Sequence, residues 1–273
     1  MTRVPIELRF PRPSVMGILN VTPDSFSDGG VHFRDPGAAA ASARAMVEAG
    51  AAIVDLGGES TRPGADGVPL DEELRRVVPV LERLEGVPVS IDTAKAEVAR
   101  RALALGAELV NDVTALRGDP ELAGVVADSG AYLCLMHMLG EPRTMQRNPV
   151  YGDVAAEVTA FLEERLAAAV EAGVAEERIC LDPGIGFGKT VEHNLELLRR
   201  LDVVAQLGRP ILVGVSRKSS LGRLLGDPHA TRGTLAASLG AAVSAFDHGA
   251  TIFRVHDVRE HVEALTIASA VAG

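Results

Sequence analysis

Short apolar runs alternate with longer amphipathic or alanine-rich segments along the whole chain. Each run is rich in Val, Ile and Leu, is only a few residues long, and ends on a polar residue, which is typical of buried strands. The runs predict strands over 15–20, 52–57, 87–92, 108–111, 132–137, 178–182, 210–216 and 251–256. The intervening segments predict helices over 36–49, 71–84, 95–105, 153–172, 191–206, 231–248 and 258–271, with a short helix from about Pro120.

This alternation predicts the fold class. Strands that are apolar throughout, joined by helices, indicate a parallel sheet with both faces covered. Eight such units in 273 residues predict a single α/β domain over residues 1–273, a (β/α)₈ TIM barrel. A doubly wound open sheet is the alternative. The stretch around Gly186 and Gly188 lacks the full GxGxxG pattern of that fold, and no acidic residue follows at the expected spacing.

Polar residues stand where the predicted strands end. In a barrel the carboxyl ends of all strands meet on one face. A single Asp or Asn after a strand is commonly a helix cap or a turn former. A polar residue after nearly every strand instead predicts an active site at that face. These residues are Asn20, Glu59 to Arg62, Asp92, Asn111, His137, Asp182, Lys218, Arg254 and His256.

The strand-end residues divide into two chemical groups. Asp92, Asn111 and Asp182 offer hydrogen-bond acceptors and one amide donor, which suits a flat aminopyrimidine ring. Lys218 lies between the two groups as a point charge. The second group suits phosphate or pyrophosphate. It contains Ser60, Thr61, Arg62, Arg254 and His256.

Glycine-rich and polar loops follow several of the strands. In 181–189 an aspartate is followed by a proline and three glycines, whose lack of a Cβ lets the backbone approach a ligand closely. The loops 22–33 and 62–68 are expected to close over the site and exclude water. Asp24 and Phe26 are the expected contacts from the first of these loops.

Composition excludes some functions. The net charge is −10, only 3% of residues are aromatic and Trp is absent, which argues against nucleic acid as a partner. A small anionic substrate needs only a few local cations and stays compatible. No run of about 18 apolar residues appears, so we expect no membrane span. The N-terminus lacks the apolar core of a signal peptide, so we expect a cytoplasmic protein.

Cysteine and lysine are both scarce. Cys134 and Cys180 lie in apolar runs and are expected to be buried core thiols. We interpret Lys95 and Lys189 as surface residues and Lys218 as functional. Histidines outside the motifs are expected at the surface or in caps. They are His32, His193, His229, His248 and His261.

Taken together, these motifs resemble the dihydropteroate synthase family over nearly the whole chain. The resemblance rests on residues 16–30, 55–64, 90–93, 111–113, 135–138, 181–189, 216–219 and 254–258. The family condenses 6-hydroxymethyl-7,8-dihydropterin pyrophosphate with p-aminobenzoate, giving 7,8-dihydropteroate and pyrophosphate in folate biosynthesis. Its members are usually homodimers, and the alanine-rich helices 231–248 and 258–271 are the expected contact.

The resemblance implies a role for each strand-end residue. Asp92, Asn111, Asp182 and Lys218 would hold the pterin, and Asp92, Asp182 and Lys218 would be catalytic. Asn20, Thr61, Arg62, Arg254 and His256 would hold the pyrophosphate, with Mg²⁺ on Asn20. Thr61, Pro63, Phe187, Lys218 and Ser219 would hold p-aminobenzoate. One Asn is a poor cation site, so most of the Mg²⁺ affinity would come from pyrophosphate oxygens.

The expected mechanism is dissociative. The C–O bond to pyrophosphate breaks first, Asp92 and Asp182 offset the resulting methylene cation, and cations offset the leaving group. The arylamine then attacks, so no protein nucleophile is needed. Met136 is a further candidate that either flanks the ring or packs in the core.

Two other functions fit part of the pattern. A class I aldolase would use Lys218 as a Schiff-base lysine, its pKa lowered by Arg217, but would leave the pyrophosphate group unexplained. A non-catalytic pterin-binding barrel, or a methyltetrahydrofolate-binding domain, would keep the pterin acceptors. It would have no use for residues 60–63 or 254–256.

Overall fold

The chain forms a closed parallel barrel. The computed structural model describes residues 3–22, 35–61, 64–141 and 143–273. Eight parallel strands form one sheet in the order β6-β5-β4-β3-β2-β1-β8-β7, and a parallel bridge between Leu181 and Ile211 joins its two edges. The TIM-barrel prediction is therefore confirmed, and the open-sheet alternative is wrong. The strands are β1 (Ser14–Asn20), β2 (Ile53–Gly57), β3 (Val89–Asp92), β4 (Leu109–Asp112), β5 (Tyr132–Met136), β6 (Ile179–Asp182), β7 (Leu212–Val213) and β8 (Ile252–Val255).

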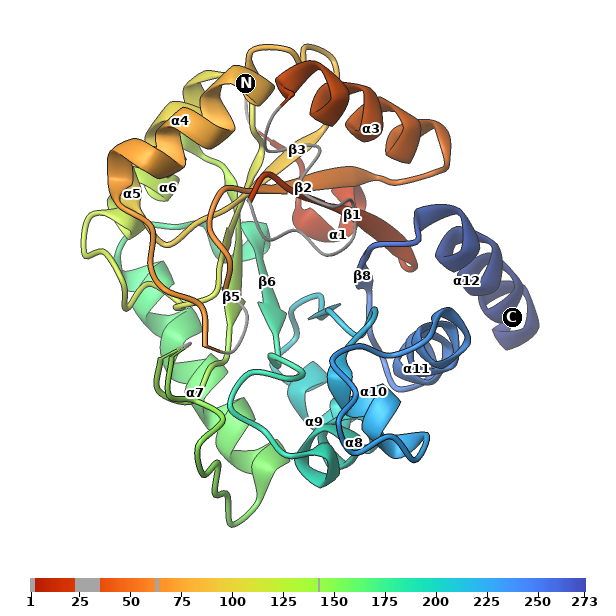
Figure 1. Cartoon of the computed structure of the whole chain (residues 1–273). Coiled ribbons are helices and arrows are strands. Elements are labelled where there is room, and N and C mark those ends of the chain that lie inside the picture. The colour runs from red at the N-terminus through yellow and green to blue at the C-terminus, as the bar shows by residue number, and fades with distance from the viewer. Residues whose placement is uncertain (1–2, 23–34, 62–63, 142) are drawn as a thin grey trace.

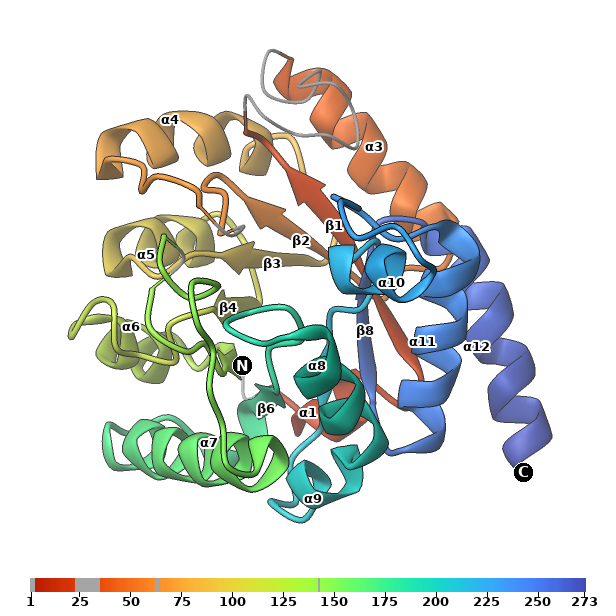
Figure 2. The same cartoon turned by 60° about the horizontal axis from the view of Figure 1, so that its bottom comes forward.

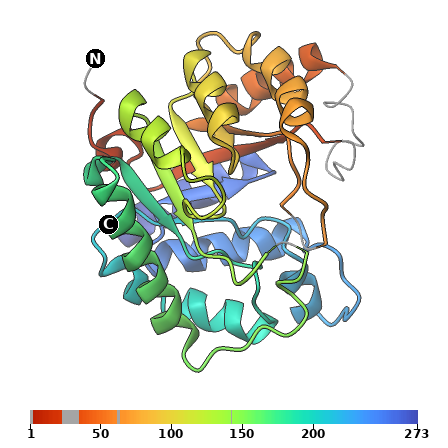
Figure 3. The same cartoon turned by 90° about the vertical axis from the view of Figure 1, so that its left-hand side faces the viewer.

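The helices surround the strands (Figures 1 and 2). Figure 3, viewed from the side of α5 to α7, shows these helices in a row over the strands. The helices are α1 (Ile6–Arg9), α3 (Pro36–Glu48), α4 (Leu70–Leu81), α5 (Ala96–Ala104), α6 (Leu122–Ser129), α7 (Val154–Glu171), the 3₁₀ turn η1 (Glu176–Arg178), α8 (Val191–Arg199), α9 (Leu201–Ala205), α10 (Ser219–Leu224), α11 (Leu235–Asp247) and α12 (Val258–Ala272). No helix in the described segments is long and apolar enough to cross a membrane.

Capping residues determine where several helices begin. Asp35 accepts hydrogen bonds from the backbone N–H groups of Gly37 and Ala38 and so caps α3. Thr234 caps α11, so the predicted helix 231–248 begins later than expected.

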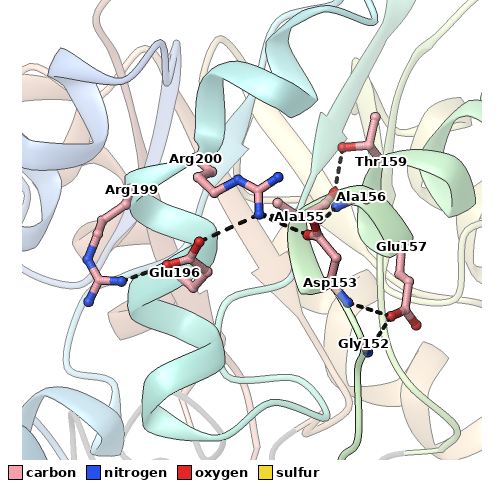
Figure 4. Close-up of polar contacts among 9 residues, drawn as sticks. All are labelled: Gly152, Asp153, Ala155, Ala156, Glu157, Thr159, Glu196, Arg199 and Arg200. Carbon is pink, nitrogen blue, oxygen red and sulfur yellow. Dashed lines mark hydrogen bonds and ion pairs between the residues drawn. The ribbon is translucent and has the colours of Figure 1, made fainter.

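The predicted helix 191–206 is wrong as a single element. It divides into α8 and α9 at Arg200, whose backbone leaves the helical region there. Figure 4 shows that Arg200 reaches across to the Asp153 carboxylate, with Nη1 3.0 Å from one oxygen and 3.1 Å from the other. Asp153 itself caps α7 by accepting from the N–H of Ala156. Arg200 thus contacts the start of α7 from the point where α8 ends, and periodicity does not encode such a contact.

The barrel interior is filled by apolar side chains. The short helix α1 closes the end where the strands begin, and its Ile6 and the following Phe10 are buried against residues of seven strands. Cys134 and Cys180 face each other across β5 and β6 as buried free thiols, as predicted. Contact with Cys180, together with burial, raises the pKa of the Cys134 thiol well above its usual value. This end of the barrel is therefore packed and inert, and the polar chemistry lies at the other end.

Candidate active site

A cavity of about 930 Å³ opens at the carboxyl ends of the strands. Strand register brings polar residues together there, because Asp92 lies beside Gly57 on one side and beside Asn111 on the other. Asn111 and Asp182 lie at the same face as nearly buried side chains. Ten of the predicted site residues line the cavity. They are Asn20, Glu59, Ser60, Thr61, Asp92, Phe187, Lys218, Ser219, Arg254 and His256.

Four other predicted residues fall outside the described part of the chain. Arg62 and Pro63, predicted for pyrophosphate and p-aminobenzoate, are among them, as are the loop contacts Asp24 and Phe26. Their roles stay predictions. Ser60 and Thr61, which precede the first two, do line the cavity.

Asp55 is a functional-site residue that sequence reasoning missed. It lies on β2 with no exposed surface. One carboxylate oxygen accepts from Ser90 Oγ at 2.6 Å. The other accepts from Asn111 Nδ2 at 3.0 Å and from Arg254 Nε at 2.6 Å. Asp55 thus holds the side chains of Asn111 and Arg254 in place. The available signal was a charged residue in the middle of an apolar strand run.

Arg254 joins Asp55 to Asp92. Its Nη2 donates to Asp92 Oδ2 at 2.8 Å. Burial opposes the charge of Arg254, but the two carboxylates outweigh it and raise the pKa of the guanidinium. Burial also raises the pKa of Asp92, which Arg254 opposes. The acidic and basic groups of the site therefore depend on each other: Arg254 lines the cavity while its charge is shared by two carboxylates.

Asp182 is held by the glycine-rich turn that follows it. Its Oδ1 accepts from the N–H of Gly184 at 2.7 Å. Burial raises the pKa of Asp182, and the Gly184 N–H and the positive charge of Lys218 oppose this rise. Lys218 Nζ lies 4.4 Å from the centre of the Phe187 ring, within range of a cation–π contact. Asp182, Lys218 and Phe187 therefore come together as predicted.

The segment before Lys218 is pinned to the end of β8. Ser216 Oγ lies 3.1 Å from His256 Nδ1. Arg217 has a left-handed φ of 57°, which is uncommon for a bulky residue. Its guanidinium donates to both oxygens of Asp257, at 3.0 and 2.5 Å. This bidentate pair offsets the backbone strain and fixes Lys218 relative to His256.

A small apolar cluster lies next to the site. Val113, Met136, Met138 and Met145 are buried together, and Phe187 packs against them. Met136 therefore belongs to packing that supports the Phe187 side of the site.

Two interpretations of basic residues as surface groups are wrong. Lys189 is only 3% exposed, because its Nζ finds acceptors in the turn before it. His261 is fully buried, with Nδ1 2.7 Å from the Asp257 carbonyl oxygen. Lys95 is partly exposed but is bound to Glu59 and Glu73. His193 caps α8 as predicted.

The site can be compared with known proteins. A profile described as pterin binding enzyme matches residues 16–256, which contain every strand end described above. The chain belongs to the pterin-binding enzyme family.

Relatives in this family are dihydropteroate synthases. The chain is 49% identical to the Escherichia coli K12 dihydropteroate synthase over 261 residues, which cover 94% of this chain and 91% of the relative. It is 48% identical to the Neisseria meningitidis serogroup C enzyme over 266 residues, 95% of this chain and 93% of the relative. Both matches run through the barrel from end to end.

Solved pterin-binding enzymes share the fold. The Yersinia pestis dihydropteroate synthase in a sulfonamide complex superposes with a TM-score of 0.90 at 46% identity, covering 96% of this chain and 95% of that one. The Xanthomonas albilineans enzyme with 4-aminobenzoic acid gives 0.86 at 49%, covering 96% and 94%. A structure of the latter enzyme with 7,8-dihydropteroate gives 0.83 at 46%, covering 96% and 95%.

Proposed function

We propose that this pterin-binding enzyme is a transferase that condenses 6-hydroxymethyl-7,8-dihydropterin pyrophosphate with p-aminobenzoate, releasing 7,8-dihydropteroate and pyrophosphate. The observation that carries the proposal is near-half identity to dihydropteroate synthases over almost the whole chain. Solved relatives containing 4-aminobenzoic acid or 7,8-dihydropteroate support the same substrate class. Folate biosynthesis is the pathway that this product implies.

Asp92, Asn111, Asp182 and Lys218 form the proposed pterin site. A pterin presents an amino group and ring N–H donors along one edge, and carboxylates accept such pairs well. Asp182 and Asn111 are nearly buried, so hydrogen bonds to a ring there would be shielded from water. Asp55 would support this site by holding Asn111.

The proposed pyrophosphate site contains the cationic and hydroxyl residues at the mouth. Arg254 and His256 come from β8 and its end, and both line the cavity. Because Arg254 already serves Asp55 and Asp92, pyrophosphate would compete with those carboxylates for its charge. The full proposed set is Asn20, Thr61, Arg62, Arg254 and His256.

Mg²⁺ is proposed as the cofactor, with Asn20 as its protein ligand. Asn20 ends β1 and lines the cavity, and its amide oxygen is a suitable hard ligand. In the described segments no group of three His, Cys, Asp or Glu side chains converges as a metal site. Pyrophosphate oxygens would therefore supply most of the coordination. When bound, the ion would neutralise charge on the diphosphate.

p-Aminobenzoate is proposed to lie beside Lys218. Phe187 offers an aromatic face there, and Ser219 begins α10 beside it. The proposed contacts are Thr61, Pro63, Phe187, Lys218 and Ser219.

In the proposed mechanism the protein stabilises charge and does not attack the substrate. As the C–O bond to the diphosphate breaks, positive charge develops on the pterin methylene. Asp92 and Asp182 would offset this charge, while Arg254 and His256 would offset that of the leaving group. The arylamine of p-aminobenzoate then forms the C–N bond and loses its proton to solvent. Asp92, Asp182 and Lys218 are the proposed catalytic residues.

A homodimer is proposed through α11 and α12, which pack against each other. Large apolar side chains are exposed on these helices, among them Leu235, Ile267 and Val271. Burying such groups against a second copy would be favourable. Light scattering of the purified protein should give twice the chain mass.

The function is tested by product analysis. The purified enzyme, given both substrates and Mg²⁺, is expected to form 7,8-dihydropteroate and one pyrophosphate per product. Pyrophosphate release at a rate that does not depend on p-aminobenzoate would contradict the proposal. Borohydride trapping of a carbonyl compound on Lys218 would favour the aldolase alternative, and tight pterin binding without turnover would favour a non-catalytic barrel.

A further inference from the structure

Lys189 is a buried cation that the proposed mechanism does not use. It ends the glycine-rich segment after β6, and its side chain reaches back into the barrel mouth. Nζ lies 2.8 Å from His137 Nδ1 and donates to the carbonyl oxygens of Gly184 at 2.9 Å and Phe187 at 3.1 Å. Among the described residues, no carboxylate forms an ion pair with it. Burying an ammonium group with only neutral acceptors costs free energy, which suggests that Lys189 has a function at this position.

The three contacts can persist whether or not Lys189 is protonated. Burial lowers the pKa of Lys189 to about 7, with Asp182 opposing and Lys218 adding to the effect. His137 stays neutral, because burial and the nearby Lys189 and Arg117 charges lower its pKa to about 2. An ammonium donates all three bonds. An amine keeps two for the carbonyls and accepts the third from His137 once the imidazole proton moves to Nδ1.

These contacts fix the turn that carries two groups of the proposed site. The Gly184 and Phe187 carbonyls bracket the turn, and the Gly184 N–H binds Asp182. The Phe187 ring faces Lys218 Nζ. Lys189 therefore ties β5, through His137, to the geometry of Asp182, Phe187 and Lys218.

Other residues hold Gly186 in the middle of the turn and Gly188 after it, so that Lys189 holds only the Gly184 and Phe187 carbonyls. Gln146 Nε2 donates to the Gly186 carbonyl oxygen at 2.7 Å, and Asn194 Oδ1 accepts from the Gly186 N–H at 2.7 Å. Tyr151 Oη donates to the Gly188 carbonyl oxygen at 2.9 Å. Loss of Lys189 should thus shift the turn and leave the barrel folded.

We propose that Lys189, seated on His137, is a positioning residue that sets the 184–187 turn so that Phe187 and Lys218 form the p-aminobenzoate side of the cavity. The assignment rests on the proposed function for the identity of that ligand. Lys189 acts through Phe187 and Lys218 and need not touch the substrate.

Steady-state kinetics tests the proposal with Lys189→Met. This variant keeps an unbranched side chain that is one heavy atom shorter, and it loses the donors. We expect KM for p-aminobenzoate to rise by about tenfold or more, since small displacements of a positioned group are costly. KM for the pterin pyrophosphate should rise less, since the turn reaches Asp182 only through the Gly184 N–H. Tyr151→Phe is the matched control: it removes one hydrogen bond to the same segment, outside the turn, and should change neither KM.

A fluorescence measurement tests the same claim without turnover. The chain has no Trp, so Phe187→Trp introduces a single reporter in the turn. Adding Lys189→Met should change its emission and its quenching by acrylamide, while adding Tyr151→Phe should not. Circular dichroism verifies that each protein is folded.

The proposal is overturned if the Trp reporter is unaltered by Lys189→Met, or if both KM values rise equally. It fails also if Tyr151→Phe has the same effect as Lys189→Met. Because fluorescence needs no substrate, the positioning role and the proposed function can fail separately. An enzyme that makes no dihydropteroate would contradict the function and leave the reporter comparison decisive for Lys189.

Discussion

At the residue scale, the site contains two kinds of buried charge: charges bound to opposite charges, and a charge bound only to neutral groups. Asp55, Arg254 and Asp92 form a connected set in which one guanidinium serves two carboxylates. Lys189 is the opposite case, a buried amine whose acceptors are neutral. The first arrangement keeps charge in the barrel mouth, and the second makes one charge sensitive to pH near neutrality.

Removing the Asp55 charge should destabilise the fold strongly. Asp55→Asn leaves Arg254 buried with one carboxylate partner fewer, and we expect a loss of about 3 kcal/mol in the free energy of unfolding. Ser90→Ala removes a single hydrogen bond to Asp55 and should cost about 1 kcal/mol. Urea unfolding measures both. Equal losses in the two variants would show that the Asp55 charge does not hold Arg254.

Lys189 should make stability depend on alkaline pH. Its folded pKa of about 7 lies below the unfolded value of roughly 10.4, so the unfolded chain binds more protons between these limits. The free energy of unfolding should rise with pH there, by at most about 1.4 kcal/mol per pH unit. Below pH 7 Lys189 is protonated in both states, so the gain in stability is absent and stability no longer changes with pH through this group. The groups that face Lys189 are Asp182 on β6, Lys218 before α10 and His137 after β5.

Comparison with Lys189→Met isolates this effect from all other titrations. Chemical unfolding of both proteins at several pH values from about 6.5 to 10 should give a stability difference that grows in favour of the wild type as pH rises. A difference that stays constant across the range would mean that Lys189 remains charged in the fold.

At the element scale, the segment between β6 and α8 carries the most closely constrained backbone of the site. Gly184 has a left-handed φ of 68°, and a Cβ there would overlap the carbonyl oxygen of His137. The sequence indicates such a loop through its proline and glycines. It does not indicate that Lys189 folds back into it, because the lysine's acceptors are backbone atoms that local sequence does not mark.

Gly184→Ala should impair both stability and activity. Gly208→Ala is a matched control, since Gly208 has a similar φ of 71° and open space around its Cα. Both variants incur the left-handed strain, about 1–2 kcal/mol, but only Gly184→Ala must also move the turn. Thermal unfolding and product formation distinguish them. Full activity in Gly184→Ala would contradict the close packing of this turn on β5.

Other elements show the limits of local sequence in the same way. Asp35 directly precedes α3 and caps it, a contact between neighbouring residues that local sequence can indicate. Arg200, where α8 ends, binds Asp153 at the start of α7, far away in the sequence. Asp55 looked like one residue of an apolar strand, and its role appears only when β4 and β8 bring Asn111 and Arg254 to it.

At the scale of the whole molecule, barrel closure brings the chemistry together. The bridge between Leu181 in β6 and Ile211 before β7 closes the barrel, and Asp92 at the end of β3 then lines one cavity with Lys218, Arg254 and His256. Hydrophobic periodicity was sufficient to predict this closure, because eight buried parallel strands have few other ways to pair. We therefore predict that a ring binds the acceptors of this site and that a diphosphate binds its cations.

Equilibrium binding of the two substrate halves tests this division most directly. Calorimetry with 6-hydroxymethylpterin and with pyrophosphate plus Mg²⁺ is carried out on the wild type, Asp182→Asn and His256→Gln. Asp182→Asn should weaken pterin binding about tenfold or more and leave pyrophosphate binding nearly unchanged, and His256→Gln should do the reverse, since each variant loses a proposed contact to one ligand only. If either variant weakens both ligands equally, the cavity is not divided as described.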